Sequence, residues 1–303
     1  MEPSTQLKTT STQTRIQLKN ILYCTDLSDT ASTVLPYVAG LARHFGSSVF
    51  ALHVRPIVQP FVAPPFGEPM EPMIPGPTET EIREGILKEL SGLSDTPNEV
   101  VIADGDVWLS VQTAIDEKKI DLIVLGTRGR TGLSKLVLGS VAEEILRRAP
   151  CAVLTVGPNA PSAPARGGEF SEILYATDFS PEASAAAPYA ISLAQEFHAN
   201  LTLLHVIPDL KVSDLATRTE VESAYENRLR QIVPPGSELW CEPHFIVLQG
   251  TAPDDILSVA NQRNANLIIL GVRRPSGFAT RLPIATAHKV VSNATGPVLT
   301  VQG

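Results

Sequence analysis

The chain has 303 residues, of which 43% are hydrophobic and 18% are charged, and its net charge at pH 7 is −8. This length allows two domains of ordinary size, and the composition is that of a globular protein. The acidic balance argues against nucleic acid or anionic membrane as a general partner, and no apolar run approaches the roughly 18 residues that span a bilayer.

The amino terminus, the cysteines and the histidines do not indicate secretion or metal binding. Residues 1–17 are rich in Ser, Thr and Gln and lack the apolar core of a signal peptide, so we expect a disordered tail. Cys24, Cys151 and Cys241 show neither metal-ligand nor redox-pair spacing. The six histidines form no cluster, and no metal site is predicted. These features favour a cytoplasmic protein with buried, reduced thiols.

Strands and helices alternate in the first half of the chain. Short apolar runs predict strands at residues 20–25, 48–54, 99–103, 121–125 and 152–156. Helical spacing of apolar residues predicts helices at residues 30–45, 78–93, 107–118 and 141–148. Ser28 or Asp29 can cap the first helix, and Thr78 with Glu81 forms a capping box at the second. Apolar strands that alternate with helices predict a parallel sheet covered on both faces.

A proline-rich segment follows the second predicted strand. Residues 56–77 contain eight prolines with large apolar side chains between them. Proline removes backbone donors and breaks helices and strand ladders, so we expect a loop, in part polyproline II. One interpretation is a lid or a partner-docking surface. We favour the other, an insertion that covers some apolar surface.

Residues 126–140, GTRGRTGLSKLVLGS, carry the main functional signal. They connect the fourth predicted strand to the last helix of the first half. Glycines let a ligand approach the backbone, and the start of the following helix, near Gly139 and Ser140, presents free N–H groups that suit phosphate. The stretch contains neither the Gly-Lys-Ser/Thr of a P-loop nor a GxGxxG pattern. The alternative is a glycine-rich turn that binds nothing.

The second half of the chain repeats the first. ILYCTD at residues 21–26 recurs as ILYATD at 173–178, and AVLTV at 152–156 recurs as PVLTV at 297–301. Such a pattern indicates an internal duplication. We predict α/β domains at residues 18–157 and 170–303, each with a five-stranded parallel sheet, joined by a linker at residues 158–169.

Gly126, Gly129, Gly139 and Ser140 match the nucleotide-binding signature of the universal stress protein family. The following SVAEEILRRAPCAVLTV also resembles the last helix and strand of that family. The chain is therefore identified as resembling a tandem, two-domain member, over nearly its whole length. The resemblance implies a Rossmann-like fold similar to that of the adenine nucleotide alpha hydrolases. It also implies that the first domain binds ATP, with or without Mg²⁺.

The resemblance, together with the position of each residue, gives a set of expected nucleotide-binding residues. In an open α/β sheet, ligands bind beyond the carboxyl ends of the strands, where the strand order reverses. The backbone at Val54 would meet the adenine, and Asp26 would lie near the adenosine, although Asp26 can also serve as a helix-capping acid. Arg128 and Arg130 either pair with phosphate oxygens or are solvated. The whole set is Thr25, Asp26, Val54, Gly126, Thr127, Arg128, Gly129, Arg130, Gly139, Ser140 and Val141.

The second copy has lost most of the signature. The residues that stand at three of its four positions are Arg274, Ile284 and Ala285. We therefore predict one nucleotide per chain. Arg273 and Arg274 either bind another anion or are surface charges, and we favour surface charges. His53 and His205 occupy equivalent strand positions, and we interpret each as a structural histidine.

Three classes of function remain open. We favour an ATP-binding stress-response or regulatory module. The alternative of a slow ATPase or autophosphorylating enzyme is weaker, because the sequence offers no Walker lysine, kinase catalytic loop or convincing base. A purely structural interaction module describes the second copy better than the first.

The last strand of each copy, at residues 152–156 and 297–301, is short and apolar. In a sheet of this type we expect it at an edge, and an exposed apolar edge invites pairing. By resemblance to single-domain family members, which dimerise through this strand, we predict that the two copies pack as an internal pseudo-dimer. A homodimer of the whole chain is left open.

Overall fold

The computed structural model describes residues 15–28, 31, 33–55, 76–93, 95–128, 138–161, 169–208, 215–237, 239–273 and 284–303. Most of the predicted tail and of the proline-rich segment lies outside these residues. The prediction of a disordered tail over residues 1–17 is wrong for residues 15 and 16, because they contact the second copy. The Ile16 N–H donates to Ser192 Oγ (3.1 Å), and Arg15 pairs with Glu196.

The first copy follows the predicted alternation of strands and helices. Its elements are β1 (Asn20–Cys24), α2 (Leu35–Phe45), β2 (Ser48–Arg55), α3 (Glu79–Glu89), the 3₁₀ turn η1 (Leu90–Leu93), β3 (Asn98–Asp104), α4 (Val107–Lys118), β4 (Leu122–Gly126), α5 (Ser140–Arg148) and β5 (Ala152–Val156). The predicted capping box of α3 is confirmed. Thr78 Oγ1 accepts the Glu81 N–H (3.3 Å), and Glu81 Oε2 accepts the Thr78 N–H (2.7 Å).

The predicted helix at residues 30–45 contains α2 (Leu35–Phe45), with Pro36 in its first turn. A proline lacks the N–H that an interior helical residue donates, and its ring crowds the preceding turn, so Pro36 suits a helix start. Ala31 is helical as well, and residues 29, 30 and 32 lie outside the described residues, so the start near residue 30 stays a prediction. The second copy carries Pro188 inside α6 (Pro181–Phe197).

The second copy contains the same succession of elements. After β6 (Glu172–Ala176) and α6 come β7 (Asn200–Ile207), α7 (Leu215–Ile232), β8 (His244–Gln249), α8 (Ala252–Gln262), β9 (Leu267–Val272), α9 (Ile284–Asn293) and β10 (Val298–Gln302).

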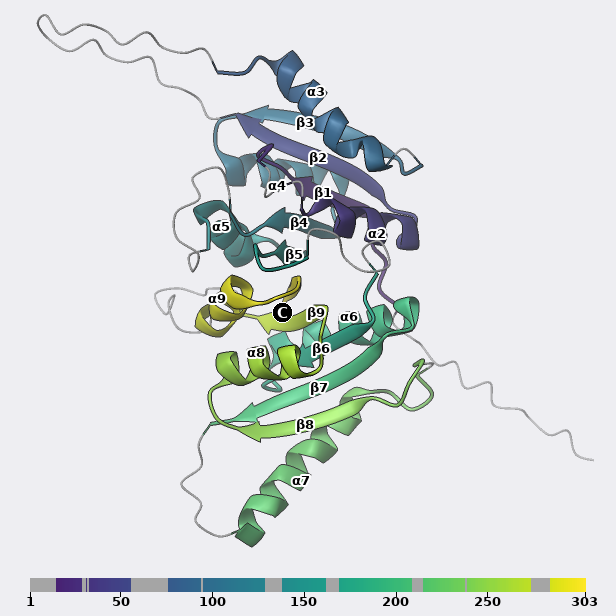
Figure 1. Cartoon of the computed structure of the whole chain (residues 1–303), viewed down its shortest axis with the longest axis vertical. Coiled ribbons are helices and arrows are strands. Elements are labelled where there is room, and N and C mark those ends of the chain that lie inside the picture. The colour runs from purple at the N-terminus through teal and green to yellow at the C-terminus, as the bar shows by residue number, and fades with distance from the viewer. Residues whose placement is uncertain are drawn as a thin grey trace, which may run out of the picture.

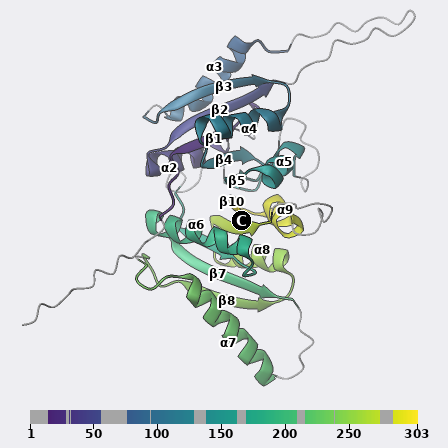
Figure 2. The ribbon, with the colours of Figure 1, turned by 180° about the vertical axis from the view of Figure 1, so that it is seen from behind.

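The ten strands form one continuous sheet, in the order β3-β2-β1-β4-β5-β10-β9-β6-β7-β8 (Figures 1 and 2). Strand pairs within each copy are parallel. β5 and β10 pair antiparallel, with Leu154 opposite Leu299. This confirms the prediction of two five-stranded parallel sheets that pack as a pseudo-dimer through their last strands.

Helices cover both faces of the continuous sheet. One buried cluster joins the sheet to α2, α3, α6 and α7, and the other joins it to α4, α5, α8 and α9. Each cluster contains residues of both copies, so the apolar core continues across the β5–β10 junction. Across the described segments, no helix combines the length and apolarity that crossing a membrane would require.

Candidate functional site

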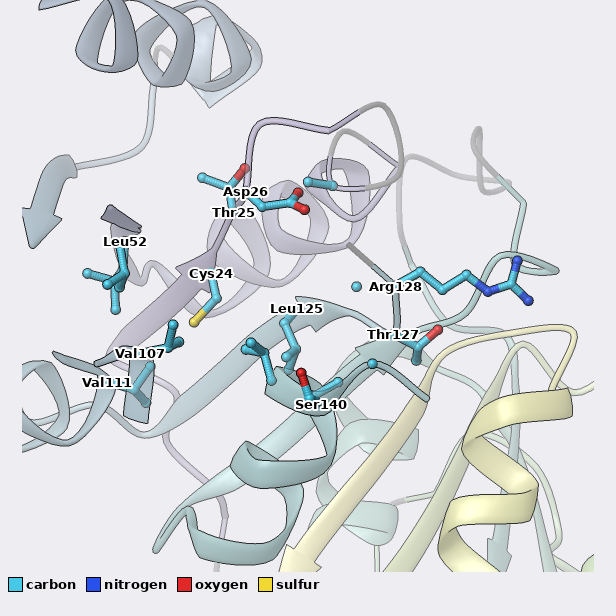
Figure 3. Close-up of a pocket in the computed structure, with 16 residues that line it drawn as sticks. Cys24, Thr25, Asp26, Leu52, Val107, Val111, Leu125, Thr127, Arg128 and Ser140 are labelled. Carbon is cyan, nitrogen blue, oxygen red and sulfur yellow. The ribbon is translucent and has the colours of Figure 1, made fainter. Parts of the chain in front are cut away.

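A pocket of about 240 Å³ opens at the carboxyl ends of β1 and β4. β1 lies between β2 and β4, so the strand order reverses at this point, as expected for a ligand site in an open α/β sheet. Figure 3 shows how β1, β2, β4, α4 and α5 contribute to its wall. Nine of the eleven expected residues line it: Thr25, Asp26, Val54, Gly126, Thr127, Arg128, Gly139, Ser140 and Val141. Gly129 and Arg130 lie outside the described residues.

Asp26 organises the turn that follows β1. Its Oδ1 accepts hydrogen bonds from the Ser28 N–H (3.1 Å) and from Ser28 Oγ (2.6 Å). Ser28 Oγ in turn accepts the Ala31 N–H (3.2 Å). Ser28 rather than Asp26 therefore plays the capping role, and Asp26 holds Ser28 in place at the edge of the pocket.

The two equivalent histidines are structural, which confirms their interpretation from the sequence. His53 Nδ1 lies 2.9 Å from Thr25 O, and His205 Nδ1 lies 2.8 Å from Thr177 O. Because a carbonyl oxygen only accepts, Nδ1 carries the hydrogen in both rings. Burial lowers the pKa of His205, which also favours the neutral ring. Each histidine fixes the carboxyl end of its first strand against the second strand.

One end of the pocket is apolar, and the sequence did not single out its residues. They are Cys24, Ala31, Leu52, Val107, Val111 and Leu125. The only available signals were the position of Cys24 at a strand end and the one-turn spacing of Val107 and Val111. Burial raises the pKa of the Cys24 thiol to about 12, so it stays protonated. The expectation of buried thiols is wrong for Cys241, which is exposed.

The other end of the pocket is formed by the two ends of the glycine loop. The Gly139 N–H donates to Thr127 O (2.9 Å), and this bond closes the neck of the loop. Gly139 is the N-cap of α5, but no side chain caps the helix. Ser140, Val141 and Ala142 of its first turn line the pocket. Uncapped N–H groups at a helix start, with the positive end of the helix dipole, favour an anionic ligand group.

Charged side chains are few in the described wall of the pocket. Asp26 and Arg128 are the two that the described lining contains. In Figure 3 the Arg128 guanidinium points away from the apolar end. No group of three or more His, Cys, Asp or Glu side chains among the described residues could hold a metal ion. The pocket thus joins an apolar end to an anion-attracting end.

In the second copy, the end of β9 lies against the first turn of α6. Gly271 on β9 lies so close to the first turn of α6 that an added Cβ would stand 2.3 Å from Glu182 O and from Ala183 Cα. Arg273 Nε donates to Glu182 Oε1 (3.0 Å) across the same contact. Arg273 is therefore engaged in an ion pair with the first turn of α6.

Comparison with known proteins agrees with this organisation. A sequence model described as the universal stress protein family matches residues 17–157 and 169–302. The chain belongs to the universal stress protein family. Because each half matches the model separately, it is a tandem universal stress protein.

Individual relatives show how far the similarity extends. Universal stress protein MJ0531 of Methanocaldococcus jannaschii is 32% identical over 140 residues, which cover 46% of this chain and 81% of that protein. Universal stress protein Rv2005c of Mycobacterium tuberculosis is 26% identical over 185 residues, covering 56% of this chain and 62% of that one. A crystal structure of a universal stress protein from Archaeoglobus fulgidus covers 95% of this chain and 99% of its own, with 21% identity and a TM-score of 0.65. That structural likeness confirms the α/β fold of the tandem chain.

Proposed function

We propose that this chain is a cytoplasmic stress-response or regulatory module that binds ATP in its amino-terminal domain. The observation that carries the proposal is the pocket at the ends of β1 and β4. Apolar residues of β2, β4 and α4 and the uncapped start of α5 line one cavity. An adenine nucleotide has the same polarity, with an apolar base at one end and an anionic phosphate chain at the other.

The lining residues fit the parts of the nucleotide. Leu52, Val107 and Val111 offer an apolar surface of the kind that suits a base. Asp26 supplies the one described carboxylate of the lining, which can accept bonds from a ribose hydroxyl or the adenine amino group. The α5 amides suit the phosphates. Mg²⁺ usually binds through substrate phosphates and few protein ligands, so we propose that it enters with the nucleotide.

We expect the intact chain to bind one ATP. The described residues of the intact glycine signature line the pocket of the first copy, whereas Arg274, Ile284 and Ala285 stand at three of the four signature positions in the second copy. Isothermal titration calorimetry with ATP, in the presence and absence of Mg²⁺, measures both the affinity and the stoichiometry. No binding would overturn the proposed function. A stoichiometry of two would show that the second copy binds ATP despite its altered signature.

We expect turnover of bound ATP to be slower than about 1 s⁻¹, the low end of typical enzymes. Phosphoryl transfer needs metal ligands, a positioned nucleophile and charge stabilisers. In the described wall of the pocket the acidic group is Asp26, and its Oδ1 already accepts two hydrogen bonds from Ser28. A multiple-turnover assay of ADP release checks this expectation, with an excess of ATP over protein. Faster release would favour the enzyme alternative.

A further inference from the structure

Glu89, the last residue of α3, lies behind the pocket rather than in its wall. Its Oε2 is 3.0 Å from Thr25 Oγ1 and 3.1 Å from Tyr23 Oη. Thr25 lines the pocket, and Tyr23 lies two residues before it on β1. The Glu89 side chain is half-buried, and no ion pair involves it within the described segments. A carboxyl group without a cationic partner thus supports two residues at the base of the ligand site.

The hydrogen count around Tyr23 constrains the state of Glu89. The Tyr23 hydroxyl lies 3.0 Å from Ala31 O as well as 3.1 Å from Glu89 Oε2, but it has one hydrogen to donate. The carbonyl of Ala31 can only accept. If Tyr23 donates to Ala31, the contact between Tyr23 and Glu89 requires a hydrogen on the carboxyl group. The Thr25 hydroxyl can still donate to the same oxygen, because it accepts the Leu27 N–H (3.0 Å) with a lone pair.

The second copy provides an internal comparison. Tyr175, the equivalent of Tyr23, donates to Ala183 O at 2.6 Å. Arg228 precedes the buried Leu229 just as Glu89 precedes the buried Leu90, and its guanidinium lies 4.0 Å from the Phe179 ring. The bond from tyrosine to carbonyl therefore forms where no described carboxyl group is hydrogen-bonded to the tyrosine. By analogy, the Tyr23 hydroxyl in the first copy donates its hydrogen to Ala31 O. The hydrogen in the contact between Tyr23 and Glu89 then comes from the protonated Glu89 carboxyl group.

The surroundings of Glu89 also favour its neutral form. Burial raises the pKa of Glu89, and the nearby Asp26 carboxylate raises it further, although hydrogen bonds from Thr25 and Tyr23 act in the opposite direction. Glu89 stands at the carboxyl end of α3, where the helix dipole disfavours a negative charge. Among the described residues packed against Glu89, the titratable groups that face its carboxyl group are Tyr23 and Asp26. Neither group carries a positive charge that would pair with a carboxylate.

We propose that Glu89 is a positioning residue of the ligand site, which in its protonated form ties α3 to Tyr23 and Thr25 and so holds Thr25 and Asp26 for nucleotide binding. This inference rests on the proposed function. Loss of the proton puts a second carboxylate near Asp26, beside the proposed place of the adenosine. The protonated form therefore binds ATP better, and the affinity falls as the pH rises through the pKa of Glu89.

The first test uses the free, full-length chain, so that it does not depend on ATP. Nuclear magnetic resonance of ¹³C-labelled glutamate follows the Glu89 carboxyl group from about pH 4 to about pH 9, across the usual range for glutamate and above it. We expect a midpoint above the unperturbed value of about 4.3, with the Thr25 and Leu27 amides shifting at the same midpoint. Glu89→Gln keeps both a donor and an acceptor, and should abolish that amide titration. Glu84→Gln, on the exposed face of the same helix, should leave it unchanged.

The second test measures ATP affinity by calorimetry below and above the Glu89 midpoint. From the lower to the higher pH, we expect the ATP affinity of the natural chain and of Glu84→Gln to fall by at least about threefold relative to that of Glu89→Gln. Only the first two chains gain a negative charge at residue 89. Titration of the phosphates themselves is common to all three chains and cancels in this comparison. A normal Glu89 midpoint, or amides that do not follow it, would overturn the inference, as would an equal pH dependence of ATP binding in all three. If none binds ATP while the amides titrate as expected, the proposed function fails and the positioning role stands.

Discussion

Gly139→Val is expected to weaken ATP binding at least tenfold, which corresponds to about 1.4 kcal/mol. A Cβ at Gly139 would lie 3.2 Å from Thr127 O, the acceptor that closes the neck of the glycine loop. The valine methyl groups would extend beyond that Cβ, beside the first turn of α5, where the phosphates need bare backbone. The substitution thus disturbs the loop neck and occupies the ligand site together. Calorimetry with ATP measures the loss of affinity.

Gly92→Val is the matched control for this substitution. Gly92 is exposed on η1, and a Cβ added there meets no atom within 4 Å. Neither glycine has a positive φ, so the two changes differ in their surroundings rather than in backbone strain. Circular dichroism establishes that both variants are folded. Unchanged ATP affinity in folded Gly139→Val would contradict the assignment of the glycine loop to the phosphates.

Leu154→Ala and Leu299→Ala are each expected to reduce the free energy of unfolding by about 2–5 kcal/mol, the usual cost of removing a buried leucine side chain. Leu154 is 1% exposed and Leu299 is 3% exposed. The two residues face each other across β5 and β10, the strands that join the copies. Each truncation leaves a cavity at the centre of the continuous sheet. Denaturant unfolding, followed by far-ultraviolet circular dichroism, measures the change.

The control is Leu109→Ala, because Leu109 is 61% exposed on α4. Its effect should stay within about 0.5 kcal/mol. The double variant tests the junction itself, since residues in direct contact show coupling energies of about 0.5–3 kcal/mol. Strictly additive effects of the two junction leucines would mean that they do not touch in solution, and would contradict the pairing of the copies.

The sequence predicted much of the pocket because its polar residues belong to short local patterns. Thr25 and Asp26 follow an apolar strand, and a strand end in a parallel sheet is where ligands bind. Gly139 and Ser140 precede a run with helical spacing, which predicts a helix start. The apolar lining was missed for a different reason. Val107 and Val111 read as ordinary core positions, and only the packing of α4 beside β1 brings them into the pocket wall.

The sequence by itself determined the duplicated α/β architecture, the edge position of the last strands and the location of the glycine loop. Those features follow from periodicity, glycine spacing and repetition, which are local properties of the chain. The tertiary structure alone decided that the end of β9 packs against the first turn of α6 and that Glu89 meets Tyr23 and Thr25. Both depend on contacts between segments far apart in the sequence. No local sequence pattern predicts whether a carboxyl group will be desolvated in such a contact, and desolvation is what raises its pKa.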